Sequence, residues 1–125
     1  VALVDVDQFK RINDTYGHPV GDEALRAIAA AMLSRIRESD TLIRYGGDEF
    51  LLIFPQISES VFYRRLSQLR DAVREIVLPD VPELRLDVSI GGVYRVTPMA
   101  EAIRQADRKM YEQKARHAAE REQTE

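Results

Sequence analysis

The sequence contains no cysteine, and this absence excludes several kinds of chemistry. Without cysteine, the 125 residues cannot form a disulfide framework, a zinc–thiolate site or a thiol nucleophile. The chain also lacks an apolar run long enough to span a membrane, and it shows no signal peptide. Together these absences predict one cytoplasmic domain that makes no contact with a membrane.

The chain also has fewer positively charged than negatively charged side chains. Lysine and arginine number 18 against 21 aspartate and glutamate residues, which gives a formal net charge of −3. A nucleic-acid-binding surface needs an excess of cationic side chains, so we expect no nucleic acid as a partner. Any phosphate group that this protein handles must therefore be held by a few local groups or by a metal ion.

The spacing of apolar residues divides the chain into strands and helices. It predicts strands at 1–6, 41–45, 50–54 and 84–90, and helices at 21–36, 58–76 and from Pro98 onward. The segment between the first strand and the first helix is interpreted as a loop, and the polar residues beyond Lys114 are expected to fray. Because the chain starts within a strand and without an initiator methionine, we expect residues 1–125 to be one domain, an N-terminally truncated fragment of a longer protein.

This order of elements, β-α-β-β-α-β followed by a last helix, predicts an α+β fold. It is the ferredoxin-like split βαβ arrangement, an antiparallel sheet with two helices on one face, here with an extra C-terminal helix. In that arrangement the first strand and the hairpin formed by 41–45 and 50–54 are central neighbours. We therefore expect Asp5 and Asp7, at the end of the first strand, to lie near Asp48 and Glu49 at the hairpin turn.

The segment Gly46-Gly47-Asp48-Glu49 combines a turn with two carboxylates. A Gly-Gly pair between apolar runs is typical of a tight hairpin, but the turn does not need the acids. Acids that converge without histidine or cysteine make an oxygen-only site, which suits Mg²⁺ or Mn²⁺ better than zinc. Such an ion could bind a triphosphate and help to activate a hydroxyl group. Either acidic pair alone is more often solvated, so the interpretation depends on the fold bringing the pairs together.

The segment after the first strand adds groups that could bind a nucleotide. Lys10 could neutralise phosphate charge, and Asn13 and Asp22 offer the amide and the carboxylate that would match a guanine edge. His18 could also contact the substrate. Without further context Asn13 is equally typical of a turn, and Asp22 of a helix N-terminus, where the dipole favours an acid.

The sequence resembles the GGDEF family of diguanylate cyclases in segments that cover nearly the whole chain. These segments are Asp5–Lys10, Asn13–His18, Gly21-Asp22, Arg44–Phe50, Ser89–Gly91 and Ala106–Lys114. The resemblance implies the palm-type fold of nucleotidyl cyclases and the condensation of two GTP molecules into cyclic di-GMP and pyrophosphate, with Mg²⁺ or Mn²⁺. This nucleotidyl transfer makes a bacterial second messenger. Because each site of this family holds one GTP, the resemblance also implies a homodimer.

The same resemblance implies roles for individual residues. Asp5, the Val6 carbonyl group and Asp48 would bind the metal ion, with help from Glu49. Asp48 would also act as the base toward the ribose 3′-hydroxyl group, and Lys10 would stabilise charge on the phosphates. The residues that would hold GTP are Asn13, His18, Asp22 and Lys114.

Arg37 and Asp40 resemble the inhibitory Arg-x-x-Asp site of the family, where the product cyclic di-GMP binds and blocks productive dimers. Arginine is suited to bidentate contacts with phosphate and guanine. The plain alternative is an exposed ion pair at a helix end. A second arginine is expected to assist, and the candidates that the sequence does not separate are Arg64, Arg65 and Arg70.

The sequence departs from the family after Lys114. Many members continue with a Gly-Arg-Asn element whose arginine touches phosphate, whereas this chain reads Ala115-Arg116-His117-Ala118. Arg116 is the candidate substitute. The departure keeps a second interpretation open, that of a catalytically weak GGDEF domain that senses GTP or cyclic di-GMP.

Overall fold

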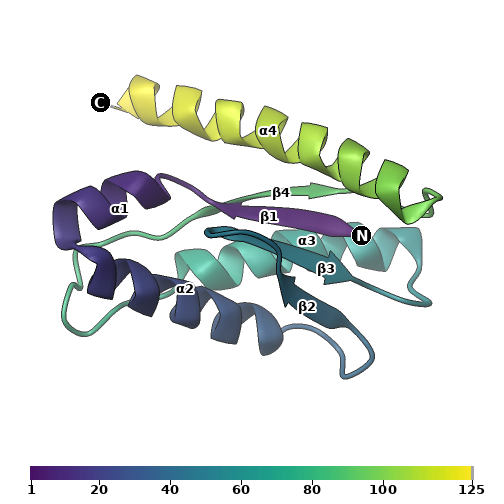
Figure 1. Cartoon of the computed structure of the whole chain (residues 1–125), viewed down its shortest axis with the longest axis horizontal. Helices are drawn as coiled ribbons and strands as arrows, with labels where there is room; N and C mark the ends of the chain where they lie inside the picture. The colour runs from purple at the N-terminus through teal and green to yellow at the C-terminus, as the bar shows by residue number, and fades with distance from the viewer. Residues whose placement is uncertain (125) are drawn as a thin grey trace.

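Four strands among residues 1–124 form a single antiparallel sheet in the order β2-β3-β1-β4 (Figure 1). We describe residues 1–124 from a computed structural model. The elements are β1 Ala2–Val6, α1 Phe9–Tyr16, α2 His18–Leu33, β2 Thr41–Arg44, β3 Glu49–Ile53, α3 Glu59–Arg74, β4 Val88–Gly92 and α4 Met99–Thr124. The order places β1 and β3 at the centre of the sheet, so the predicted ferredoxin-like α+β fold is confirmed.

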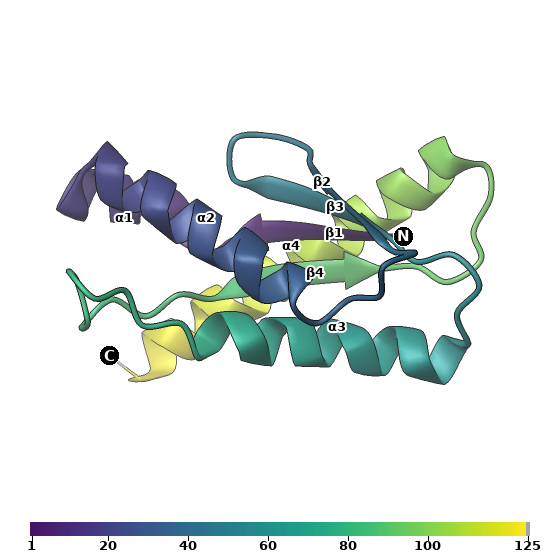
Figure 2. The ribbon, with the colours of Figure 1, turned by 90° about the horizontal axis from the view of Figure 1, so that it is seen from below.

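Helices cover both faces of the sheet (Figures 1 and 2). Helices α2 and α3 lie on one face, where Val4 and Leu52 belong to the larger apolar core. Helix α4 lies on the other face, where Leu3 and Leu51 pack in a second apolar cluster. The alternation follows from strand geometry, in which successive side chains point to opposite faces. No helix among residues 1–124 is long and apolar enough to cross a membrane.

Two helix boundaries near the N-terminus differ from the prediction. Phe9–Tyr16 forms helix α1, where the sequence was interpreted as a loop, and α2 begins at His18 instead of Gly21. Gly17 separates the two helices with φ +92°, and its N–H donates to the Asn13 carbonyl at 2.8 Å. Glycine takes this backbone conformation without strain. Gly17-His18-Pro19 therefore forms the junction between α1 and α2. Pro19 can lie within α2 because proline is tolerated in the first turn of a helix.

The last strand and the last helix also differ from the prediction. The strand is β4, Val88–Gly92, instead of 84–90, and all five of its residues are buried. Helix α4 does not fray after Lys114 but continues to Thr124. Its backbone passes close to β4, since a Cβ atom at Gly91 would lie 2.0 Å from the Ala106 carbonyl oxygen. Glycine at position 91 thus permits the contact that seats α4 on the sheet.

Candidate active site

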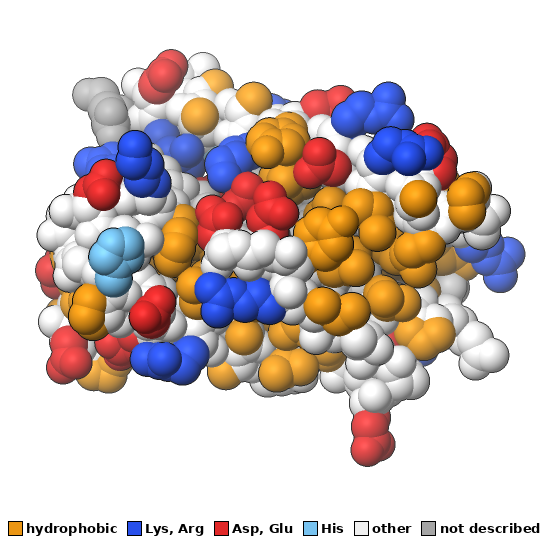
Figure 3. Space-filling model, viewed as in Figure 1, with side chains coloured by type: hydrophobic (Ala, Val, Ile, Leu, Met, Phe, Trp, Pro, Cys, Tyr) orange, Lys and Arg blue, Asp and Glu red, His pale blue; other side chains and the backbone are white. Residues whose placement is uncertain are grey.

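Three carboxylates lie together at one end of the central strands. In the pairing of β1 with β3, Asp5 is directly opposite Glu49, and the Val6 N–H donates to the Asp48 carbonyl oxygen at 3.1 Å. Acidic side chains gather at the middle of the face shown in Figure 3, below α4. The fold therefore brings Asp5 to Asp48 and Glu49, as the order of the elements predicted.

Asp5 is the most constrained of these acids. Its side chain is only 6% exposed, Oδ2 accepts a hydrogen bond from Lys114 Nζ at 3.0 Å, and Oδ1 is buried without a hydrogen-bond partner among the described residues. Burial raises the pKa of Asp5 to about 6, against the opposing effect of Lys114 and with a further contribution from Asp48. Burial and the neighbouring Asp48 also raise the pKa of Glu49. A buried carboxylate with an unpaired oxygen is poorly satisfied, which favours a bound cation.

The hairpin turn does not need its glycines for its own shape. The Tyr45 and Gly46 N–H groups donate to the Glu49 carbonyl at 2.9 and 3.3 Å, and Arg44 Nη2 donates to the Gly47 carbonyl at 2.7 Å. Among the glycines of residues 1–124, only Gly17 has a positive φ. A Cβ atom at Gly47 would have no neighbour within 4 Å. The Gly-Gly pair, although typical of a tight hairpin, is therefore not required by the backbone conformation of this turn, and Gly47 leaves open space in front of the backbone.

Helix α1 carries Lys10 and Asn13. Lys10 is exposed in its first turn, whereas the Asn13 Oδ1 atom is buried and has no hydrogen-bond partner among the described residues. A Cβ atom at Gly21 would lie 1.9 Å from Asn13 Oδ1. Glycine at position 21 thus allows α2 to pass close to this amide group.

Asp22 lines a cavity of about 500 Å³ between α2 and the hairpin. Its walls include the apolar side chains of Leu25, Leu42 and Phe50, with Arg44 at the hairpin side. His18, also assigned to the nucleotide, is exposed as the first residue of α2. The cavity therefore combines apolar walls with a carboxylate, a combination that suits a flat polar ring.

Arg37 and Asp40 form an ion pair with each other. Arg37 Nη2 lies 2.8 Å from Asp40 Oδ1, and the Asp40 side chain is 1% exposed. Arg37 also donates to the carbonyl groups of Pro55 and Gln56, at 2.6 and 3.2 Å. The pair therefore joins the connection between α2 and β2 to the loop that follows β3.

The three candidates for the second arginine of the inhibitory site, Arg64, Arg65 and Arg70, have different surroundings. Arg65 Nη1 donates to the Arg35 carbonyl at 2.6 Å, which places it beside the segment that leads to Arg37. Arg70 instead pairs with both oxygens of Asp87, each at 2.9 Å. Arg64 is exposed.

Arg116 lines a groove between α3 and α4, together with Tyr63 and Gly92. Lys114 faces Asp5 from the same helix, and residues two apart on a helix do not share a face. Arg116 therefore does not join Lys114 as a second cation near Asp5.

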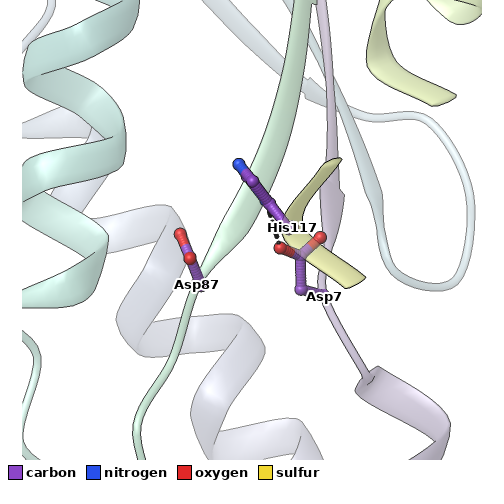
Figure 4. Close-up of side chains that lie close together, drawn as sticks. All are labelled: Asp7, Asp87 and His117. Atoms are coloured by element: carbon purple, nitrogen blue, oxygen red, sulfur yellow. Dashed lines mark hydrogen bonds and ion pairs between the residues drawn. The ribbon is translucent and has the colours of Figure 1, made fainter. Parts of the chain in front are cut away.

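Asp7 belongs to a network that the sequence interpretation missed. Asp7 is 4% exposed, Ser89 Oγ donates to its Oδ1 at 2.6 Å, and His117 Nδ1 lies 2.7 Å from its Oδ2 (Figure 4). Asp7 thus pairs with β4 and α4, although it was grouped with the other acids. The sequence did hold a signal, because Lys114 and His117 are one helical turn apart and Asp5 and Asp7 share a strand face.

Asp7, Asp87 and His117 also lie near enough to share a metal ion, with ligand atoms within 4.8 Å of one another. Their atoms already have partners within the chain, however. Both oxygens of Asp87 accept hydrogen bonds from Arg70, so a cation at this position would have to displace that guanidinium group.

Comparison with known proteins agrees with this geometry. Residues 1–120 match the family model described as "Diguanylate cyclase, GGDEF domain". Diguanylate cyclase DosC of Escherichia coli K12 is 41% identical over 93 residues, which are 73% of this chain and 20% of DosC. The chain thus spans about a fifth of the length of that relative.

Two solved structures show the same fold. Diguanylate cyclase SiaD from Pseudomonas aeruginosa, solved with its activator SiaC, superposes with a TM-score of 0.84 at 38% identity, over 91% of this chain and 45% of SiaD. The GGDEF domain of DgcB from Caulobacter crescentus, solved with c-di-GMP, gives 0.82 at 31% identity, over 91% of this chain and 70% of that one. By sequence and by fold, the chain belongs to the GGDEF domain family.

Proposed function

We propose that this domain is a diguanylate cyclase, which condenses two GTP molecules into cyclic di-GMP and releases pyrophosphate. The observation that carries the proposal is the state of Asp5, a buried carboxylate with one unpaired oxygen, opposite Glu49 and beside a hairpin turn with open space at Gly47. The similarity to DosC and SiaD, both named diguanylate cyclases, supports the same activity.

The donor set fits Mg²⁺ or Mn²⁺. Asp5, Asp48 and the Val6 carbonyl group would hold the ion, with Glu49 beside them, and oxygen ligands are those that both ions prefer. Asp5 Oδ1, which is buried without a hydrogen-bond partner among the described residues, is the atom that such an ion would satisfy. When bound, the ion supplies charge stabilisation for a triphosphate and for a developing alkoxide.

Two lysines would complement the phosphate charge. Lys114 is one-third exposed and already holds its ammonium group 3.0 Å from Asp5 Oδ2, so a phosphate close to Asp5 lies within its reach. Lys10 is exposed on the first turn of α1, which follows β1 after only Asp7 and Gln8. In this proposal Lys10 stabilises the charge of the transition state, and Asp48 accepts the proton of the ribose 3′-hydroxyl group.

The guanine would bind between α1, α2 and the hairpin. The cavity beside Asp22 has apolar walls that could cover a purine face, and its carboxylate can accept hydrogen bonds from the N1–H and amino groups. The buried oxygen of Asn13 lacks a donor, which a bound nucleotide could supply. His18 would contact the same nucleotide from the start of α2.

We further propose that two copies must meet, because one site holds one GTP and the product contains two. The product would inhibit by binding at Arg37 and Asp40, with Arg65 as the assisting arginine, since it lies beside Arg35. Most donors of Arg37 already serve Asp40 and the Pro55 and Gln56 carbonyl groups. Product binding at this site would therefore have to replace some of these bonds.

One observation favours the second interpretation, a domain that binds GTP or cyclic di-GMP with little turnover. Arg116 faces the groove between α3 and α4, so Lys114 has no arginine from its own helix turn to share the phosphates. Weak phosphate contacts would lower turnover without abolishing nucleotide binding.

Measuring pyrophosphate release against protein concentration separates the two interpretations. A cyclase that works as a homodimer releases pyrophosphate at a rate per protein molecule that rises with concentration, and the rise must vanish in Asp48→Asn. Titration with GTP in the presence of Ca²⁺ reports binding independently. Binding without pyrophosphate release, in a preparation shown to be dimeric, would favour the sensor and contradict the cyclase.

A further inference from the structure

Helix α4 loses its apolar contacts with the sheet before it reaches Lys114. Its buried apolar residues are Ala102, Ala106 and Met110, spaced four residues apart along one face. Beyond Met110, His117 is the only buried residue of α4 among the side chains described. The turns that carry Lys114 therefore depend on polar anchors. Gln113 Oε1 accepts a hydrogen bond from the Ile90 N–H at 2.7 Å, and His117 makes the buried contact.

His117 makes the buried anchor through a single ring nitrogen. Its Nδ1 lies 2.7 Å from Asp7 Oδ2 and 3.1 Å from Ser89 Oγ, while the Ser89 hydroxyl donates to Asp7 Oδ1 at 2.6 Å. The serine proton goes to Asp7, so Nδ1 is the nitrogen that carries a proton and donates it. His117 and Asp7 are each 4% exposed and Ser89 is fully buried, so water does not compete for these bonds.

This arrangement has the residue types of a Ser-His-Asp triad but not its geometry. In such a triad the histidine accepts the serine proton on one nitrogen and donates to the carboxylate from the other. Here both partners meet Nδ1, and the remaining nitrogen points away from Asp7 (Figure 4). The network therefore serves to hold elements together, joining the end of β1, the strand β4 and the helix α4.

Two acids, Asp5 in β1 and Asp7 directly after it, match two side chains of α4. Asp5 bonds Lys114 and Asp7 bonds His117; the two acids are two positions apart in extended chain, and Lys114 and His117 are one helical turn apart. Residues three apart on a helix are separated by about 4.5 Å of axial rise, and residues two apart on a strand by about 6.6 Å. Together with the bond between Gln113 and the Ile90 N–H, the second contact thus fixes the rotation and the position of the helix turn that makes the first.

We propose that His117 is a positioning residue, whose bond to Asp7 sets the Lys114 ammonium group on Asp5 at the nucleotide site. The inference rests on the proposed function for its consequence, which is a higher affinity for the phosphates of GTP. Its structural part, the placement of Lys114, holds independently of turnover.

The first measurement needs no nucleotide. In ¹H–¹⁵N spectra the Lys114 side-chain ammonium signal, assigned by its loss in Lys114→Arg, is visible while Asp5 protects it from exchange with water. His117→Leu removes the donor and is expected to abolish that signal. His117→Asn, which keeps an N–H group near the position of Nδ1, should retain it, as should the exposed control Glu122→Gln on the same helix.

The second measurement is the affinity for a non-hydrolysable GTP analogue with Mg²⁺, by calorimetry. We expect His117→Leu to weaken binding by about 10-fold to 100-fold, as losses of supporting contacts do. The loss should not add to that of Lys114→Ala, because both variants remove the same contact. His117→Asn should restore most of the affinity, which a general loss of stability would not explain.

An unchanged Lys114 signal in folded His117→Leu, or losses that add in the double variant, would overturn the proposal. If His117→Leu does not fold, Asp7→Asn takes its place, since it removes the charged acceptor at equal volume and must also release Lys114. A wild-type protein that fails to bind the analogue would contradict the proposed function alone, because the ammonium signal still decides where Lys114 lies.

Discussion

Replacing Asp5 with asparagine should stabilise the protein without metal while it abolishes cation binding. Folding raises the pKa of Asp5 from 3.8 to about 6, chiefly by burial. A difference of roughly two pKa units corresponds to about 3 kcal/mol against the ionised folded state. Asparagine carries no charge, and Lys114 is one-third exposed and can turn to water. Because the new amide is itself poorly paired, we expect a net gain of about 1–2 kcal/mol in the free energy of unfolding near neutral pH.

The effect should depend on pH with a defined sign. The folded pKa of Asp5 lies above the unfolded one, so the folded state holds the proton more tightly. The contribution of this group to stability therefore falls as pH rises from about 4 to about 6 and is level above that range. Asp5→Asn lacks this fall, so its advantage should be absent near pH 4 and complete above about pH 6.

Urea unfolding in the presence of a chelator measures both quantities. The wild type and Asp5→Asn are compared at about pH 4.5 and about pH 7.5, and then with Mn²⁺ at the higher pH. Mn²⁺ should stabilise the wild type by mass action and leave the variant unchanged. A variant that is less stable at both pH values, or one that Mn²⁺ stabilises equally, would refute the reasoning.

Three further substitutions test the site and its support. Gly47→Ala should leave the free energy of unfolding unchanged or raise it by up to about 1 kcal/mol, because the added Cβ meets only open space. It should lower GTP affinity, because that Cβ occupies space in front of the backbone that the proposal leaves to the nucleotide. A large loss of stability on urea unfolding would contradict this. Gly91→Ala should cost about 3 kcal/mol or more, since its Cβ would lie 2.0 Å from the Ala106 carbonyl oxygen, and a stability equal to that of Gly47→Ala would be inconsistent with the seating of α4. Asp22→Asn should bind GTP at least about tenfold more weakly and lose preference for GTP over ITP, which lacks the amino group, whereas a retained preference in calorimetry would place the guanine elsewhere.

The sequence was sufficient for the parts of the fold that follow from local pattern. The spacing of apolar residues around the hairpin and in the helix after Ser58 predicts the order of the elements, and this order predicts the sheet. The helix begins where Ser58 Oγ accepts a hydrogen bond from the Val61 N–H, at 3.4 Å. That topology alone placed Asp5 opposite Glu49.

Helix α1 could not be found in the same way, because it is short. Phe9, Ile12 and Tyr16 do have helical spacing and pack on the core, but eight residues are fewer than such a pattern needs to indicate a helix. The left-handed conformation of Gln8, with φ +58°, begins the helix directly after the strand, where a loop is the usual expectation. Gly17 and Pro19, which follow α1, are also typical of a loop.

The end of α4 depended on contacts between residues far apart in the sequence. The residues after Lys114 are polar, and polarity at a chain end is typical of fraying. Their helix is held by His117 against Asp7, which lies 110 positions away. The local spacing shows that Asp5 and Asp7 share a strand face and that Lys114 and His117 are one helical turn apart, but it does not say which residues pair. The same reason explains why Asp7 was grouped with Asp5, Asp48 and Glu49.

The most direct test of the account is to incubate the purified domain with GTP and Mg²⁺ or Mn²⁺ and to separate the products by chromatography. The account predicts cyclic di-GMP and pyrophosphate from the wild type at concentrations that allow two copies to meet, and neither product from Asp48→Ala. Cyclic di-GMP formed equally by Asp48→Ala would contradict the assigned metal site. Its absence from a dimeric wild-type protein that binds GTP would contradict the activity itself.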